Sequence, residues 1–172
     1  MFHSKLTSFV KAITYLLPGL IPDGENHTVN PVSKAWFSTG LEHPLVFHAL
    51  VFAGSIHLDF LRTSRIFPNS PQALSHKLVV IQKLKEIMND PGKAQRDEVI
   101  LAILVLSSHE STDPSRVRSN PFVSPLKNAQ WLNIYGNIAY VPEHMKAVLD
   151  LITIRGGLEK LELHGLAETI AG

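Results

Sequence analysis

One stretch of the sequence constrains the fold more than any other, HPLVFHALVFAGSIHLDFLR at residues 43–62. Its apolar side chains recur on almost every face of a helix, and Pro44 suits a first helical turn, where a backbone N–H has no helical partner anyway. A helix that is apolar nearly all round must be buried among other elements. The pattern therefore predicts a core helix at 44–62 with further helices packed around it.

The rest of the chain favours helices too. Ser70 and Pro71 form a helix start, and Pro91 and Gly92 form a stop. No run shows the period-2 alternation of a strand. We predict an all-α fold, a compact array of about five to seven helices without a sheet, with helices near 4–17, 44–62, 71–89, 95–109 and 142–155 and a weak helix closing the chain after residue 157.

A chain of 172 residues fits one ordinary domain. We expect a single helical domain over 1–172, with an N-terminal amphipathic helix within 1–20 and a loop over 21–43. The core then spans 44–172, and three prolines near 111–130 predict a mobile loop there.

Composition excludes several classes of protein. The chain has no cysteine, so disulfides, thiolate nucleophiles and cysteine-based zinc modules are absent. The formal net charge is +1 and the basic residues are scattered, which argues against direct binding of nucleic acid. Nine histidines are many, but none has a partner at the i,i+4 spacing of a helical zinc site. We predict no metal, and the lack of nucleotide-binding motifs predicts no cofactor.

The sequence predicts neither a membrane span nor a secretion signal. The longest apolar run, Val99 to Leu106, is far shorter than the roughly 20 residues that a span needs. We expect an intracellular protein, cytoplasmic or nuclear, with a mitochondrial presequence as the weaker interpretation of the N-terminal amphipathic stretch.

A polar stripe interrupts the apolar helix. His48, Ser55, Asp59 and Arg62 fall on one narrow face, so they either line an internal cavity or form a solvent-facing edge. His57 lies on the opposite face, where a buried core histidine is the simpler interpretation.

Two further polar groups lie at helix ends, Ser107 to Glu110 and Glu143 with His144. Arg155, Gly156 and Gly157 close the later helix, and a cation followed by glycines is a sufficient helix stop by itself. The alternative is a site to which these side chains contribute. Under that alternative we assign acid–base or orienting roles to His48, Asp59, His144 and Arg155 and ligand contacts to Phe52, Ser55, Arg62, His109 and Glu110.

The order of these segments resembles a known family, the fungal-specific transcription factor domain, which is the helical regulatory region C-terminal to a binuclear zinc cluster. The resemblance covers roughly Trp36 to Leu166. Its sharpest part is the helix that starts near His144 and ends in Arg-Gly-Gly-Leu at 155–158. The family's zinc cluster needs six cysteines, and this sequence has none. The family's domain also continues beyond this motif, so the chain is either a fragment or a free-standing relative that has lost DNA binding. The start at Met1 favours the free-standing relative, and this is what we expect.

Three functions follow from the resemblance and the residues. The chain binds an apolar small molecule in a helix-lined pocket, or it is a cofactor-free cyclase or isomerase of fungal secondary metabolism, or it is a non-catalytic regulatory module that acts through protein partners. The first two share one pocket and form the leading hypothesis. We also expect a homo-oligomer, because a short helical array leaves apolar faces to cover.

Overall fold

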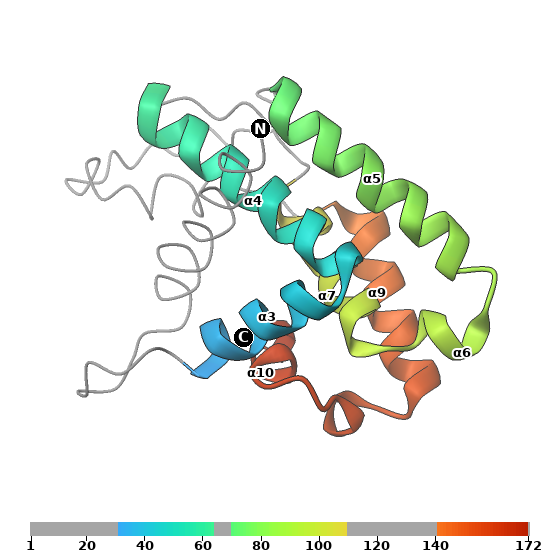
Figure 1. Cartoon of the computed structure of the whole chain (residues 1–172). Coiled ribbons are helices and arrows are strands. Elements are labelled where there is room, and N and C mark those ends of the chain that lie inside the picture. Colours follow the sequence, from blue (N-terminus) through green and yellow to red (C-terminus); the bar gives the residue numbers. More distant parts are fainter. Residues whose placement is uncertain (1–30, 64–69, 110–140, 172) are drawn as a thin grey trace, which may run out of the picture.

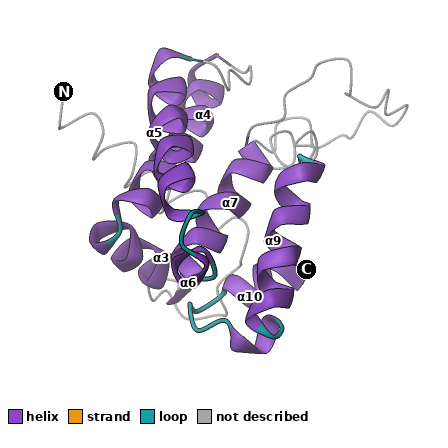
Figure 2. Cartoon of the chain, turned by 90° about the vertical axis from the view of Figure 1, so that its right-hand side faces the viewer, coloured by secondary structure: helices purple, strands orange, loops and turns teal. Residues whose placement is uncertain are grey.

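The computed structural model of the chain describes residues 31–63, 70–109 and 141–171 (Figure 1). This part consists of helices and their connections, and no strand occurs in it (Figure 2), which confirms the all-α prediction. With the labels of Figure 1, the elements are α3 (Pro31–Glu42), α4 (Pro44–Thr63), α5 (Pro71–Ile87), α6 (Pro91–Ala94), α7 (Asp97–His109), α9 (Pro142–Arg155), the 3₁₀ turn η3 (Leu158–Lys160) and α10 (Leu166–Ala171).

The centre of the fold is α4, as its apolar composition predicts. Every side chain from Ala49 to Leu58 is buried. Helix α5 packs along α4 in the opposite direction, and α7 packs against a second side of α4 (Figure 1). Helix α9 then covers α7 and runs antiparallel to it, since Met145 contacts Ser107 at one end and Arg155 contacts Asp97 at the other.

Helix starts follow the local sequence closely. The Ser70 hydroxyl accepts a hydrogen bond from the Ala73 N–H, with Pro71 in the first turn, as predicted. The helix stops before Pro91 as predicted, but Pro91 also begins a further helix. Helix α5 ends at Ile87, and Asp90 caps a new short helix, α6, whose first residue is Pro91. Proline suits a first turn as well as it suits a stop, and the acceptor at Asp90 makes it a start here.

The loop predicted over 21–43 is also wrong in its second half, which forms α3. Its buried residues include Val32, Trp36 and Gly40, which lie one turn apart. The prediction took Pro31 as loop punctuation, although a proline after Asn30 equally marks the first turn of a helix. The predicted helix at 4–17 and the loop near 111–130 lie outside the described residues.

The glycine pair after α9 ends this helix as predicted. Gly156 adopts a left-handed conformation with φ 106°, and its N–H bonds the Thr153 carbonyl while the Gly157 N–H bonds the Ile152 carbonyl at 3.0 Å. This pair of bonds satisfies carbonyls that the helix end leaves without partners.

Beyond the glycines, the chain turns back across the molecule. The predicted closing helix is shorter than expected, because η3 and the stretch 161–165 precede α10. This stretch packs on α3, where Trp36 is buried and its Nε1–H donates to the His164 carbonyl at 3.1 Å. Gly165 has φ 78° and lies against Val32, so α3 and α10 meet side by side (Figure 1).

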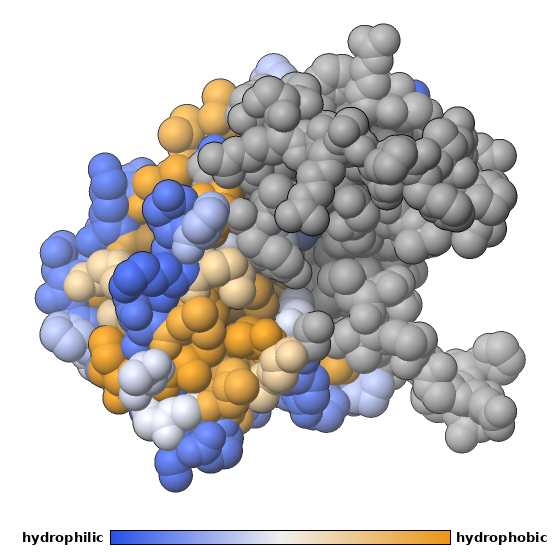
Figure 3. All heavy atoms as spheres, turned by 180° about the vertical axis from the view of Figure 1, so that it is seen from behind, coloured by the Kyte–Doolittle hydropathy of each residue, from blue (hydrophilic) through white to orange (hydrophobic). Residues whose placement is uncertain are grey.

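The surface of the described part is mixed. None of its helices has both the length and the apolar composition needed to cross a membrane. Seen from behind the view of Figure 1, apolar side chains reach the surface among charged ones (Figure 3). Six large apolar side chains of the described part are exposed. They lie on α5, on α9, near the end of α3 and just after α5: Leu74, Leu78, Leu149, Ile154, Leu41 and Met88.

We predict that Gly165→Ala destabilises the protein by about 2 kcal/mol or more. The positive φ disfavours a side chain, and a β-carbon would lie 2.6 Å from Val32 Cγ1. Gly92→Ala is the matched control, because a β-carbon there meets its nearest neighbour, Asp90 Oδ1, at 3.4 Å. Urea unfolding of both variants checks this, and equal midpoints for Gly165→Ala and the wild type would contradict it.

Candidate functional site

Arg155 is the best-connected of the predicted site residues. It ends α9, and its Nη1 lies 2.9 Å from Asp97 Oδ1 in an ion pair whose side chains are mostly buried. The same nitrogen donates to the Gln95 carbonyl at 2.6 Å, and Nε donates to the Lys160 carbonyl at 2.9 Å. The guanidinium therefore attaches two turns to the end of α9. One is the turn between α6 and α7, and the other is η3.

Asp97 extends this network to the C-terminal segment. Its Oδ2 accepts hydrogen bonds from the backbone N–H groups of Glu162 and Leu163, at 2.7 and 2.6 Å. The carboxylate thus holds one cation and two backbone donors at the start of α7. We name Arg155 and Asp97 together the arginine–aspartate tie. These bonds give Arg155 a structural role, and its predicted role toward a ligand stays a prediction.

His48 pairs with a histidine that the sequence analysis did not single out. The Nδ1 atoms of His48 and His76 lie 2.8 Å apart, with His76 fully buried on α5. One ring must donate and the other accept, so this bond requires at least one of the two rings to be neutral. Phe47 meets the His48 ring edge-on at 5.5 Å. The predicted stripe therefore lies partly in the contact between α4 and α5.

The other stripe residues differ in their surroundings. The Ser55 hydroxyl is buried and donates to the Val51 carbonyl of its own helix, while Asp59 is half-buried and Arg62 is exposed near the end of α4. His144 is half-buried in the first turn of α9, eleven residues before Arg155. Because that spacing is roughly 16 Å along a helix axis, His144 and Arg155 lie at opposite ends of α9. A pocket shared by these residues and His48 stays a prediction.

A second buried histidine lies between α4 and α7. Phe52 is fully buried and meets the His109 ring edge-on at 6.4 Å. His109 Nδ1 lies 2.9 Å from the Val105 carbonyl, which can only accept, so this nitrogen carries the proton. Burial is the main cause that lowers the pKa of His109 to about 4; the hydrogen bond to Val105 opposes this shift and the nearby His57 adds to it. Burial also lowers the pKa of His57, which is a core histidine as predicted. Glu110 lies outside the described residues.

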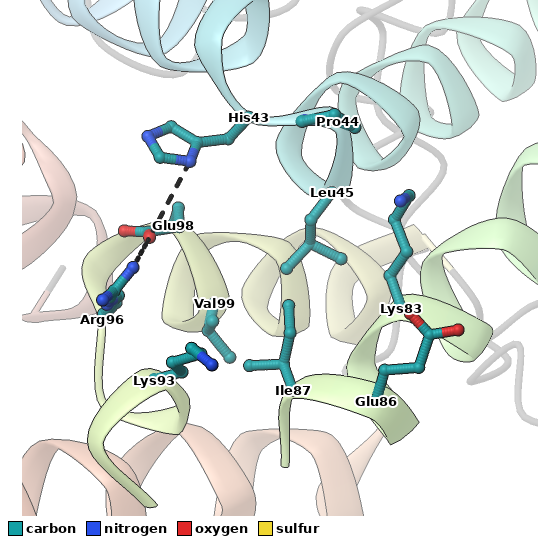
Figure 4. A pocket seen from close by; sticks show the side chains of 10 residues that line it. All are labelled: His43, Pro44, Leu45, Lys83, Glu86, Ile87, Lys93, Arg96, Glu98 and Val99. Carbon is teal, nitrogen blue, oxygen red and sulfur yellow. Dashed lines mark ion pairs between the residues drawn. The ribbon is translucent and has the colours of Figure 1, made fainter. Parts of the chain in front are cut away.

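A half-open pocket of about 290 Å³ lies elsewhere, between the start of α4, the end of α5, and α6 with the start of α7 (Figure 4). Its floor is apolar and consists of Pro44, Leu45, Ile87 and Val99. Its rim is charged and consists of His43, Lys83, Glu86, Lys93, Arg96 and Glu98. We call it the charged-rim pocket. No group of three potential metal ligands is arranged to hold an ion within the described ranges.

The sequence pattern of the fungal specific transcription factor domain matches residues 14–164. The chain belongs to this family. Searches of curated proteins and of solved structures found no match. The family assignment confirms the resemblance, and the match begins earlier than the sequence analysis expected.

In this member of the fungal specific transcription factor domain family, the Arg-Gly-Gly-Leu motif has a definite structural task. The glycines end α9 and the arginine forms the arginine–aspartate tie. Nothing in the sequence pattern indicated Asp97 as a partner of Arg155. Asp97 and Arg155 lie 58 residues apart in the sequence, and no helical or strand spacing predicts a contact at that separation.

We predict that Arg155→Gln destabilises this family member by about 2–3 kcal/mol, because it leaves the Asp97 carboxylate poorly compensated in a mostly buried position. Lys146→Gln is the matched control on the same helix. Lys146 pairs with Asp150 at an exposed position, where such pairs contribute less than about 1 kcal/mol. Denaturant unfolding compares the two, and equal losses of stability would refute the special role of Arg155.

The buried His109 predicts a dependence of stability on pH. Its folded-state pKa of about 4 lies below the unfolded value of 6.5. Between these two values the unfolded chain binds a proton that the folded chain does not. The free energy of unfolding is therefore at its full value above pH 6.5 and falls as the pH drops to about 4, at up to about 1.4 kcal/mol per pH unit. His109→Gln should make this decline shallower, whereas the exposed control His164→Gln should not. Thermal melts across this pH range test the difference.

Proposed function

We propose that the chain serves as a regulatory domain in fungal transcription, which acts by binding other molecules and carries out no catalysis. The family assignment supports the regulatory part of this proposal. The arginine–aspartate tie is the observation that supports a binding role without catalysis. Arg155 stands in the motif that marks the family most sharply, and its guanidinium is engaged by Gln95, Asp97 and Lys160.

The histidines support the same proposal. An acid–base catalyst needs a titratable group that reaches a substrate. His48 Nδ1 is engaged with His76, and His109 is buried with a pKa well below neutrality. A cofactor-free cyclase or isomerase centred on His48 therefore receives less support from these contacts than a binding role does.

DNA contact through a binuclear zinc cluster is not a property of these residues, because the sequence contains no cysteine. We propose that any effect on transcription passes through a ligand or a protein partner. Self-association also stays a proposal, and the exposed leucines Leu74 and Leu78, one turn apart on α5, would be part of such a contact.

The proposal predicts that the chain, fused to an unrelated DNA-binding domain, changes the expression of a reporter gene severalfold in a fungal host. Arg155→Gln should reduce this effect by loosening the C-terminal segment, and Lys146→Gln should leave it unchanged. Immunoblots of the fusions control for protein level. Identical expression from the fusion and from the DNA-binding domain alone would contradict the proposal.

A further inference from the structure

We propose that the charged-rim pocket binds a small carboxylate with an apolar body. The pocket is independent of the predicted stripe on α4, and no residue of its rim or floor belonged to the sequence-based site. Its volume of about 290 Å³ is close to the lower end of the range for ligand sites in proteins. The ligand is therefore a compact molecule.

The floor of the pocket selects an apolar body. Leu45 and Val99 are buried core residues, and Ile87 is half-buried at the end of α5. Their side chains meet between the charged groups (Figure 4). The apolar surface that a ligand on this floor would remove from water therefore comes mainly from the half-buried Ile87 and the exposed Pro44. A small polar ion alone would leave this surface exposed.

The rim favours a negative charge, because its lysine and arginine side chains, Lys83, Lys93 and Arg96, outnumber its carboxylates, Glu86 and Glu98. Lys93 Nζ already lies 2.8 Å from Asp90 Oδ2, which leaves Lys83 and Arg96 as the cations for a ligand. Both rim carboxylates already have neighbours. Glu98 Oε1 lies 3.8 Å from His43 Nδ1 and 3.9 Å from Arg96 Nη1, and Glu86 accepts from Gln82 at 3.5 Å. The first two distances are too long for hydrogen bonds, so the donors of Arg96 stay available.

Arg96 and Lys83 face the floor from opposite sides (Figure 4). Arg96 is about half exposed, at 57 %, and Lys83 forms no ion pair with a described carboxylate. A guanidinium offers paired donors that match the two oxygens of a carboxylate, and the positive end of α7 lies beside it. We assign Arg96 as the main carboxylate contact and Lys83 as the second cation.

The pocket is also joined to the arginine–aspartate tie. Within the four residues from Gln95 to Glu98, Gln95 and Asp97 contact Arg155, while Arg96 and Glu98 line the pocket. Helix α5 packs mainly on α4 and only slightly on α7. A ligand that touches both Lys83 and Arg96 adds a contact between α5 and the start of α7, which stabilises the folded chain.

The test titrates the full chain with octanoate as the probe, with octanamide and octylamine as the neutral and cationic analogues. We expect octanoate to bind with a Kd of about 1 mM or tighter, as measured by calorimetry. At ten times this Kd, the melting temperature should rise by about 3–6 °C. Octanamide should bind about tenfold more weakly, and octylamine more weakly still.

Two pairs of variants locate the site. Arg96→Gln should weaken octanoate binding about tenfold and leave octanamide binding unchanged, and Lys83→Gln should act in the same direction. Lys85→Gln, two residues further along α5 and exposed, is the matched charge control. Ile87→Trp should fill the floor and abolish binding of both probes, whereas Met88→Trp on the exposed neighbour should not. Melting curves show that each variant is folded.

Three outcomes would overturn the proposal. Equal affinities for octanoate and octanamide would remove the role of charge. Tighter binding of octylamine would assign the site to a cation. Octanoate affinity that is insensitive to both Arg96→Gln and Ile87→Trp would show adsorption elsewhere on the surface. Each of these outcomes leaves the reporter test of the regulatory domain unaffected.

Discussion

The ion pair between Arg155 and Asp97 joins three parts of the chain at one point. Through it, the end of α9, the turn before α7 and the segment after η3 become one unit. Asp97 is mostly shielded from water, and a carboxylate in such a place requires compensation by donors. It receives a guanidinium and two backbone N–H groups. The packing of α7 on α9 does not by itself place the C-terminal segment, which Asp97 holds at one end and α3 holds through Trp36 and Val32.

The major helices could be predicted because their signals are local. Helix α4 is apolar all round, and α5 and α9 begin with proline in the first turn, so their boundaries lie within two residues of the prediction. Helix α3 was missed because its first residue, Pro31, was taken as a loop proline. A proline can mark either a loop or the first turn of a helix, and the prediction chose the loop at Pro31.

The candidate site could be predicted much less well. Periodicity places His48 and Asp59 on one face of α4, but it does not state which neighbour that face meets. The partner of His48 is a histidine on α5, and the partner of Arg155 is an acid at the start of α7. The charged-rim pocket draws on three separate stretches of sequence, none of which carries a motif. Such sites arise from tertiary contacts that sequence spacing does not encode.

The contact between α3 and α10 determines how force would enter this domain. Val32 lies against Gly165 and Trp36 donates to the His164 carbonyl, so the first and last described helices touch each other on one side of the body (Figure 1). Chain that precedes residue 31 and chain that follows residue 171 therefore attach close together. A pull applied through both attachments would load this small contact first and would reach the buried α4 only after the contact had opened.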